Sequence, residues 1–339
     1  MAEVNGVVTH PPFIIVVSKC VTSGRPRPHD LIANGPRHPM ASIAAEKGER
    51  RDMIKKLLTE GRLLDAISEG CTDKKIKVVQ KKIEACLVEA AKTCEESKWK
   101  CVYGSEAEPG KLRSDFFQEN GTLSIRFVAP FDVPCTSLAA IAREFDLVTS
   151  WNKFCTNALI LSVHSLMSLS AYAESWLPWP YANRSLVLKA LACDVLDQHG
   201  CYCILLEQIA ALDEEKSQSP EVVSVRKIVP ESASVECDVK EGSFIKLVPI
   251  AKDKTEATMV FHIDAKMAMA PDFLIQFFFY FMTPWIYNMM KGVVQNAVEE
   301  SSPYSKRFKE HEDFYNLMNQ RSLAFIEASE SGGKIKKEG

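Results

Sequence analysis

The chain has 339 residues, of which 46% are hydrophobic and 25% charged, and its formal net charge is −3. This average mixture excludes a wholly disordered chain, a collagen-like fibre and a long coiled coil, and the balanced charge gives no bias toward nucleic acid. The length predicts one large domain with appendages, or two domains, with enough chain for a sizeable core. The eleven cysteines are odd in number and scattered, which is typical of reduced thiols in a cytoplasmic protein.

The N-terminal part of the chain changes character twice. Residues 1–42 are rich in proline and loop-forming residues without periodicity, so we expect a disordered extension. In residues 43–97, apolar side chains such as Leu57, Leu64 and Ile83 recur at helical spacing. This pattern predicts two or three amphipathic helices that lead into the next domain and pack on it or pair with another helix.

From about Lys98 the hydrophobic period shortens to that of strands. The predicted elements are strands at 98–103, 112–117 and 122–128, a helix at 135–146, a short helical piece at 150–154, and strands at 158–167, 169–177, 185–196, 201–210, 221–229, 232–240, 243–250 and 255–265. The pair Asn120–Gly121 predicts a tight hairpin turn. Consecutive short strands joined by turns indicate an antiparallel sheet.

A long apolar helix follows the strands. Phe273–Met290 carries no charged side chain, but Gln276, Thr283 and Pro284 interrupt it. We therefore interpret it as a helix that covers an apolar space within a folded domain rather than as a membrane span, and we expect Pro284 to kink it. Residues 299–339 contain a polar break, then a predicted amphipathic helix and a disordered tail.

This order of elements predicts an α+β fold in which a curved antiparallel sheet wraps around a long C-terminal helix, with extra N-terminal helices. Where the helix does not fill the sheet, the remaining space is an apolar cavity, which is the usual form of a ligand site. The helix face expected to line that cavity consists of Leu274, Phe278, Phe281, Trp285 and Met289.

One segment resembles a known family. PWPYANRS, which is residues 178–185, resembles the loop between the two central strands of START domains. The residues that match the family pattern are Pro178, Trp179, Pro180, Asn183 and Arg184, whereas Ser185 stands where the family usually has Asp. SWNKF at 150–154, VVSVRKIVPE at 222–231 and TPWIYNMMKGVV at 283–294 also fit the family's order, so the resemblance extends over residues 80–298.

The resemblance implies the helix-grip fold, with residues 98–298 as a START-like domain. It also implies non-covalent binding of a lipid, sterol or other hydrophobic molecule, for transfer or sensing, with transient contact to membrane surfaces and without a metal or cofactor. Trp179, Arg184 and Arg226 are candidate ligand contacts, the two arginines for a polar headgroup. An exposed position or an ordinary ion pair is the alternative for each arginine.

The sequence lacks the nucleophile-elbow, zincin, dinucleotide-binding and P-loop motifs, so we predict no catalytic residue. Cys201 and Cys203 have no second ligand pair, so we predict no metal site. Two alternatives to a lipid-binding protein remain open. One is an enzyme of the polyketide cyclase or dehydrase type, which needs a facing polar pair in its cavity. The other is an interaction protein with a vestigial cavity that binds a partner through residues 43–97 and 303–328.

Overall fold

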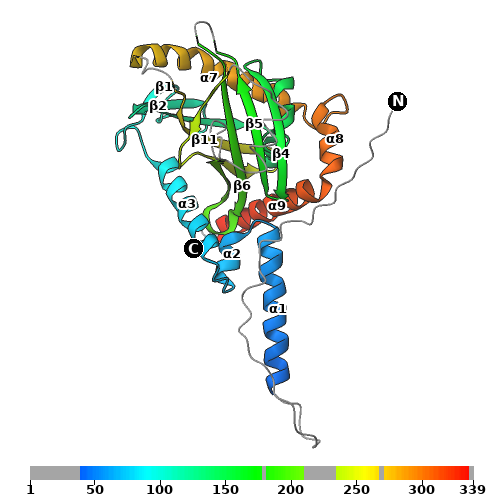
Figure 1. Cartoon of the computed structure of the whole chain (residues 1–339). Coiled ribbons are helices and arrows are strands. Elements are labelled where there is room, and N and C mark those ends of the chain that lie inside the picture. The colour runs from blue at the N-terminus through cyan, green and yellow to red at the C-terminus, as the bar shows by residue number, and fades with distance from the viewer. Residues whose placement is uncertain (1–38, 178–180, 210–233, 267–270, 336–339) are drawn as a thin grey trace, which may run out of the picture.

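The structure is a computed structural model that describes residues 39–177, 181–209, 234–266 and 271–335 (Figure 1). The predicted strand at 221–229 with Arg226, and Trp179, lie outside these residues. Three helices come first, where the helical spacing predicts two or three: α1 (Pro39–Thr59), α2 (Leu63–Ser68) and α3 (Lys74–Ala91). In Figure 1, α1 projects away from the rest of the chain.

A sheet of 11 strands forms the centre of the molecule. Its strands are β1 (Lys100–Tyr103), β2 (Arg113–Glu119), β3 (Thr122–Phe131), β4 (Cys155–Ser165), β5 (Ser168–Ser175), β6 (Arg184–Val195), β7 (Cys201–Gln208), β8 (Val235–Glu236), β9 (Asp238–Val239), β10 (Phe244–Ala251) and β11 (Lys254–Asp264). The main path runs β1-β2-β3-β11-β10-β7-β6-β5-β4, and the neighbours along it are antiparallel. The single strand predicted at 232–240 was wrong, because the short strands β8 and β9 pair with different partners, β6 and β11.

The hairpin between β2 and β3 confirms the predicted turn. Asn120 has φ 51° and Gly121 has φ 79°, and the flanking Glu119 and Thr122 are paired. Two consecutive positive φ angles define a type I′ turn, which matches the right-handed twist of the two strands. This local choice also fixes the register of β2 against β3, and with it the face of the sheet to which each side chain points.

The helices divide between the two faces of the sheet. We call the face covered by α2 and α3 the outer face, where a cluster includes Ile83, Cys193, Cys203 and Phe244, all 0% exposed. The inner face is covered by α4 (Cys135–Arg143), α7 (Asp272–Gln295) and α9 (Glu312–Ile335). Figure 1 shows α7 across one end of the strands and α9 across the other end.

Two features of this arrangement differ from the expectation. The inner face is not covered by one long helix alone, since Phe314 and Met318 of α9 belong to the same buried cluster as Met290 of α7. The polar break was expected after residue 299, but the helix α8 (Pro303–Glu310) begins there. Ser302 caps α8 and Pro303 occupies its first turn, which is a start signal that sequence analysis missed.

Among the described residues, the remaining short helices are η2 (Phe145–Ser150) and α5 (Leu196–His199). The helical piece predicted at 150–154 therefore lies earlier in the chain, at η2. α7 is continuous through Pro284. Within the described part of the chain, no helix combines the length and apolarity of a membrane span.

Candidate ligand-binding surface

The inner face of the sheet carries apolar side chains that the helices do not fully cover. Ile125 lies opposite Phe261, and Phe127 opposite Met259, on β3 and β11. All four side chains are only partly buried, as is Ile245 on β10. On the outer face of the same strands, Phe244 and Val260 are 0% exposed. Apart from Val128, Val248 and the exposed Ile250, the apolar side chains left accessible on these strands lie on the side of α7.

α7 itself presents a second apolar surface. Its N-terminal half exposes Phe273 (72%), Leu274 (48%), Phe277 (64%), Phe278 (44%), Phe281 (57%) and Trp285 (43%). We call these six residues the α7 apolar surface. Contiguous exposed apolar side chains of this size mark binding sites rather than ordinary surface.

Polar contacts hold one side of α7 against the strands. The hydroxyls of Thr283 and Ser114 are 2.7 Å apart, and Tyr287 donates from its hydroxyl to the Pro130 carbonyl at 2.7 Å. At the start of the helix, Asp272 forms an ion pair with Lys100 of β1. These contacts fix α7 to β1, β2 and β3 and leave the α7 apolar surface on the other side of the helix.

The opposite end of the inner face is closed by α9. Tyr202 on β7 donates from its hydroxyl to the Met318 carbonyl at 3.1 Å, and Arg321 pairs with Asp194 at 2.7 Å. The cavity left between α4, α9 and the sheet is about 50 Å³, lined by residues that include Leu169 and Met318. That is room for one or two water molecules. A larger ligand on the inner face must therefore lie on the side of α7.

The structure describes six of the eight ligand contacts expected from the sequence. Leu274, Phe278, Phe281 and Trp285 belong to the α7 apolar surface, and Met289 is partly buried on the same helix. Trp285 packs edge-on against Phe154, with 4.4 Å between ring centroids. The ligand contacts of these residues remain predictions.

Arg184 lies at the first position of β6. Its guanidinium donates to backbone carbonyls, from Nε to Ala265 and from Nη1 to Ala182, both at 2.6 Å. Arg184 therefore caps the carbonyls beside the start of β6 through two of its three guanidinium nitrogens. The sequence could not show this, because Ala265 is distant in the chain.

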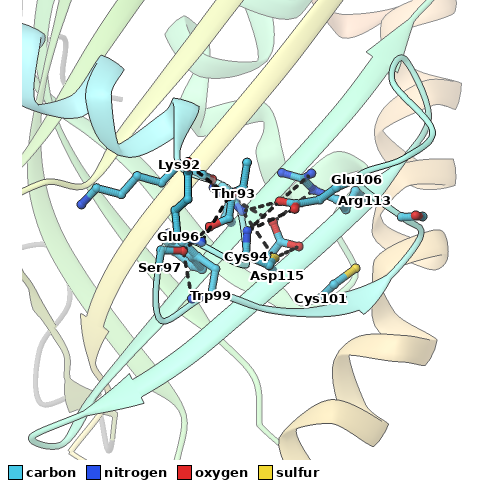
Figure 2. Close-up of polar contacts among 12 residues, drawn as sticks. Lys92, Thr93, Cys94, Glu96, Ser97, Trp99, Cys101, Glu106, Arg113 and Asp115 are labelled. Atoms are coloured by element: carbon cyan, nitrogen blue, oxygen red, sulfur yellow. Dashed lines mark hydrogen bonds and ion pairs between the residues drawn. The ribbon is translucent and has the colours of Figure 1, made fainter.

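A buried polar cluster on the outer face was missed by sequence analysis (Figure 2). Arg126 and Asp115 form an ion pair at 2.6 Å, and Arg113 lies 3.2 Å from the same Asp115 oxygen. The backbone N–H of Cys94 donates to Glu106 at 3.0 Å. These contacts hold the connection between α3 and β1 against the outer face of the sheet.

The thiol in this cluster is not a nucleophile. Burial raises the pKa of Cys94 to about 12, with further contributions from the charges of Asp115 and Glu106. A thiol with this pKa remains protonated near neutral pH, whereas catalytic cysteines need the thiolate. The part of the chain that the structure describes also contains no group of His, Cys, Asp and Glu that could hold a metal ion.

A pocket of about 650 Å³ lies on the outer face between α3, β7 and the turn that joins β9 to β10, and its lining includes Cys86, Leu205 and His262. His262 Nδ1 is 2.7 Å from the Ser124 hydroxyl, which is the contact of a nucleophile with its base. Ser124, however, is 2% exposed and does not line the pocket. The pair therefore offers no hydroxyl to a bound substrate.

Comparison with protein-family models finds no match, and comparison with curated protein sequences finds none either. Solved structures do match. Human STARD10 is 13% identical, with a TM-score of 0.50 over 71% of this chain and 84% of STARD10. Human StAR-related lipid transfer protein 5 is 12% identical, with a TM-score of 0.50 over 66% of this chain and 97% of that protein. This likeness shows the fold: the chain has the α+β helix-grip fold of START domains, as predicted.

Proposed function

We propose that this chain binds a lipid, sterol or other hydrophobic molecule without catalysis, and that it holds this ligand on the inner face of the sheet beside α7. One observation carries the proposal. Ile245, Met259 and Phe261 on the sheet stay partly exposed, and the α7 apolar surface lies uncovered on the helix that crosses the same face. Covering these surfaces with a ligand removes apolar area from water on both partners, at about 0.8 kcal/mol for each buried CH₂ group.

To act as a carrier or sensor, the protein needs an element that moves to let the ligand enter and leave. α7 is the candidate, since its N-terminal half has few buried residues, among them Ile275 and Thr283. Segments with few buried contacts open most easily. Opening of α7 would let the ligand pass between a membrane surface and the inner face.

A cyclase-type enzyme is less well supported. Such an enzyme needs facing polar side chains where the ligand lies. Arg321 and Asp194 are a facing pair on the inner face, but they join α9 to the sheet at the closed end. Their hydrogen bonds serve the fold.

The proposal is tested by identifying the molecule that co-purifies with the protein. Protein purified from its own cells is expected to carry a hydrophobic molecule, which native mass spectrometry detects and lipid analysis of the extract identifies. Protein that carries none, and takes up none from vesicles of phosphatidylcholine, cholesterol and ceramide, would contradict the proposal.

Two variants of strand β10 locate the site. Ile245→Trp fills space on the inner face, and Ile250→Trp adds the same bulk at a position that is 50% exposed. We expect Ile245→Trp to lower ligand occupancy about fivefold or more, because overpacking opposes the ligand, and Ile250→Trp to leave it unchanged. Circular dichroism and the melting temperature verify that both variants fold.

A further inference from the structure

Resting on the proposed function, we infer that the ligand is an uncharged lipid, whose polar part is no more than a hydroxyl, carbonyl or amide group. The evidence is where the sheet places its charges. Side chains on a strand alternate between the faces, so the register assigns each strand position to the inner or the outer face.

The inward positions of the central strands are mostly apolar. The apolar ones are Leu123, Ile125, Phe127, Ala129 and Phe131 on β3, Ala257, Met259, Phe261 and Ile263 on β11, Ile245, Leu247 and Pro249 on β10, Ile204 and Leu206 on β7, and Leu186, Leu188, Ala190 and Ala192 on β6. The uncharged polar ones are Thr255 on β11 and Tyr202 and Gln208 on β7. On these five described strands, inward charged residues occur only at the two ends of β6, as Arg184 and Asp194.

The outward positions of the same strands carry the charge instead. They include Arg126 on β3, Glu256 on β11, Lys246 on β10, Glu207 on β7 and Lys189 on β6. The five strands therefore do carry charged residues, but they place most of them on the outer face.

The two inward charges lie at opposite ends of β6 and not over the middle of the face. Arg184 donates to the carbonyls of Ala265 and Ala182, and Asp194 is paired with Arg321 at the end that α9 closes. A phosphate or carboxylate buried over the middle of this face would have no partner of opposite charge on the five strands, because Arg184 lies at one end of β6 and the inward Lys100 of β1 is paired with Asp272. Burial of an unpaired ion is strongly unfavourable, so the face discriminates against charged lipids.

A small neutral polar group meets a different environment. Ser114 and Thr283 place two hydroxyls between β2 and α7, 2.7 Å apart and both nearly fully buried. Each hydroxyl can donate and accept. Both hydroxyls are as buried as that of Ser124, so a hydroxyl or carbonyl of the ligand reaches them only when α7 moves away from β2, and it then meets no charge.

The test uses pairs of lipids that differ in one charged group: ceramide and ceramide-1-phosphate, diacylglycerol and phosphatidic acid, cholesterol and cholesterol sulfate. Each lipid is presented in phosphatidylcholine vesicles, and its transfer to the purified full chain is measured by mass spectrometry of the recovered protein. In every pair that binds, we expect the neutral member to bind at least about tenfold tighter. Equal or tighter binding of the charged member overturns the inference and leaves the proposed function intact. Failure of all six lipids, together with the absence of a co-purifying lipid, contradicts the proposed function itself.

A charge placed on the inner face gives an independent readout. Ile245→Lys adds a cation inward on β10, and Ile250→Lys adds it at the exposed control position. The preference for the neutral member of each pair is expected to shrink about tenfold in Ile245→Lys and to persist in Ile250→Lys. An unchanged preference in a folded Ile245→Lys variant would contradict the inference. If that variant does not fold, the lipid pairs measured on the unmodified chain still test the inference.

Discussion

Arg126 donates from Nε to Oδ2 of Asp115 at 2.6 Å, and neither side chain is exposed to solvent. The guanidinium also lies 4.8 Å from the centre of the Trp99 ring, and its Nη1 donates to the Lys92 carbonyl. One arginine thus joins β2, β3 and the connection that follows α3. Because the pair is buried, its effect on stability depends on both partners being present.

Removal of one partner is expected to destabilise the chain strongly. Asp115→Asn leaves Arg126 charged and buried, which lowers the free energy of unfolding by about 3–5 kcal/mol. Asp272→Asn, which breaks the exposed pair with Lys100, is the control and costs less than about 1 kcal/mol. Urea unfolding followed by circular dichroism measures both. Similar losses in the two variants would show that Arg126 is not buried as described.

Alkylation of the cysteines tests which face of the sheet each strand residue occupies. Cys193 and Cys203 are 0% exposed on the outer face, and burial raises the pKa of Cys193 to about 12. Cys101 on β1 is exposed. Iodoacetamide at pH 7.5 is therefore expected to label Cys101 first and to leave the two buried thiols unmodified until urea is added. Peptide mass spectrometry gives the order, and early labelling of Cys203 would contradict the assigned register.

His262 is expected to make stability depend on pH. Burial lowers the pKa of His262 below its usual 6.5. The unfolded chain then binds the proton more readily than the folded one, so this histidine contributes stability above pH 6.5 that is lost as the pH falls toward its folded pKa. The unfolding free energy should fall between pH 7.5 and 5.5, and less steeply in His262→Gln. The same pH slope in both proteins would exclude His262 as a cause.

The contacts of Arg321 are expected to hold α9 in place. Arg321→Ala removes the bonds to Asp194 and Asp197 and leaves Asp194, which is 3% exposed, without its partner in α9. We expect a loss of about 1–3 kcal/mol and faster hydrogen exchange across α9. Lys306→Ala, at a side chain that is 82% exposed, is the control and should change neither. Unchanged exchange in Arg321→Ala would mean that α9 is held by apolar packing alone.

The local part of the fold was predictable from the sequence, because it depends on neighbouring residues. Asn120–Gly121 predicted a hairpin, and consecutive strands joined by short turns predicted an antiparallel sheet, but the pairing of β3 with β11 and of β7 with β10 was not predicted. The position of α9 was not predictable. Its spacing of Phe314, Met318 and Phe325 shows that one side is buried, but the pattern does not say against which surface.

The candidate site was predictable in outline only. The apolar α7 stood out because a long uncharged stretch is rare, but which of its sides would be covered depends on contacts such as Thr283 with Ser114. The absence of charge from the middle of the inner face could be recognised only from the register of the strands, since a shift of one residue exchanges the two faces. The burial of Arg126 could not be predicted from the sequence, because Asp115 becomes its partner only through the pairing of β2 with β3.

Asp197 forms ion pairs with Arg62, at the start of α2, and with Arg321 of α9, at 2.8 and 2.9 Å. The N-terminal helix α2 and the C-terminal helix α9 are therefore tied to a single carboxylate on the short helix α5. A shortened protein limited to residues 98–298, the segment predicted as a START-like domain, would lack both guanidinium groups that pair with Asp197 and would expose the buried Asp194 beside it. Expression of that segment alone should then give a less cooperative protein than the whole chain, and fragment boundaries are best placed outside Arg62 and Arg321.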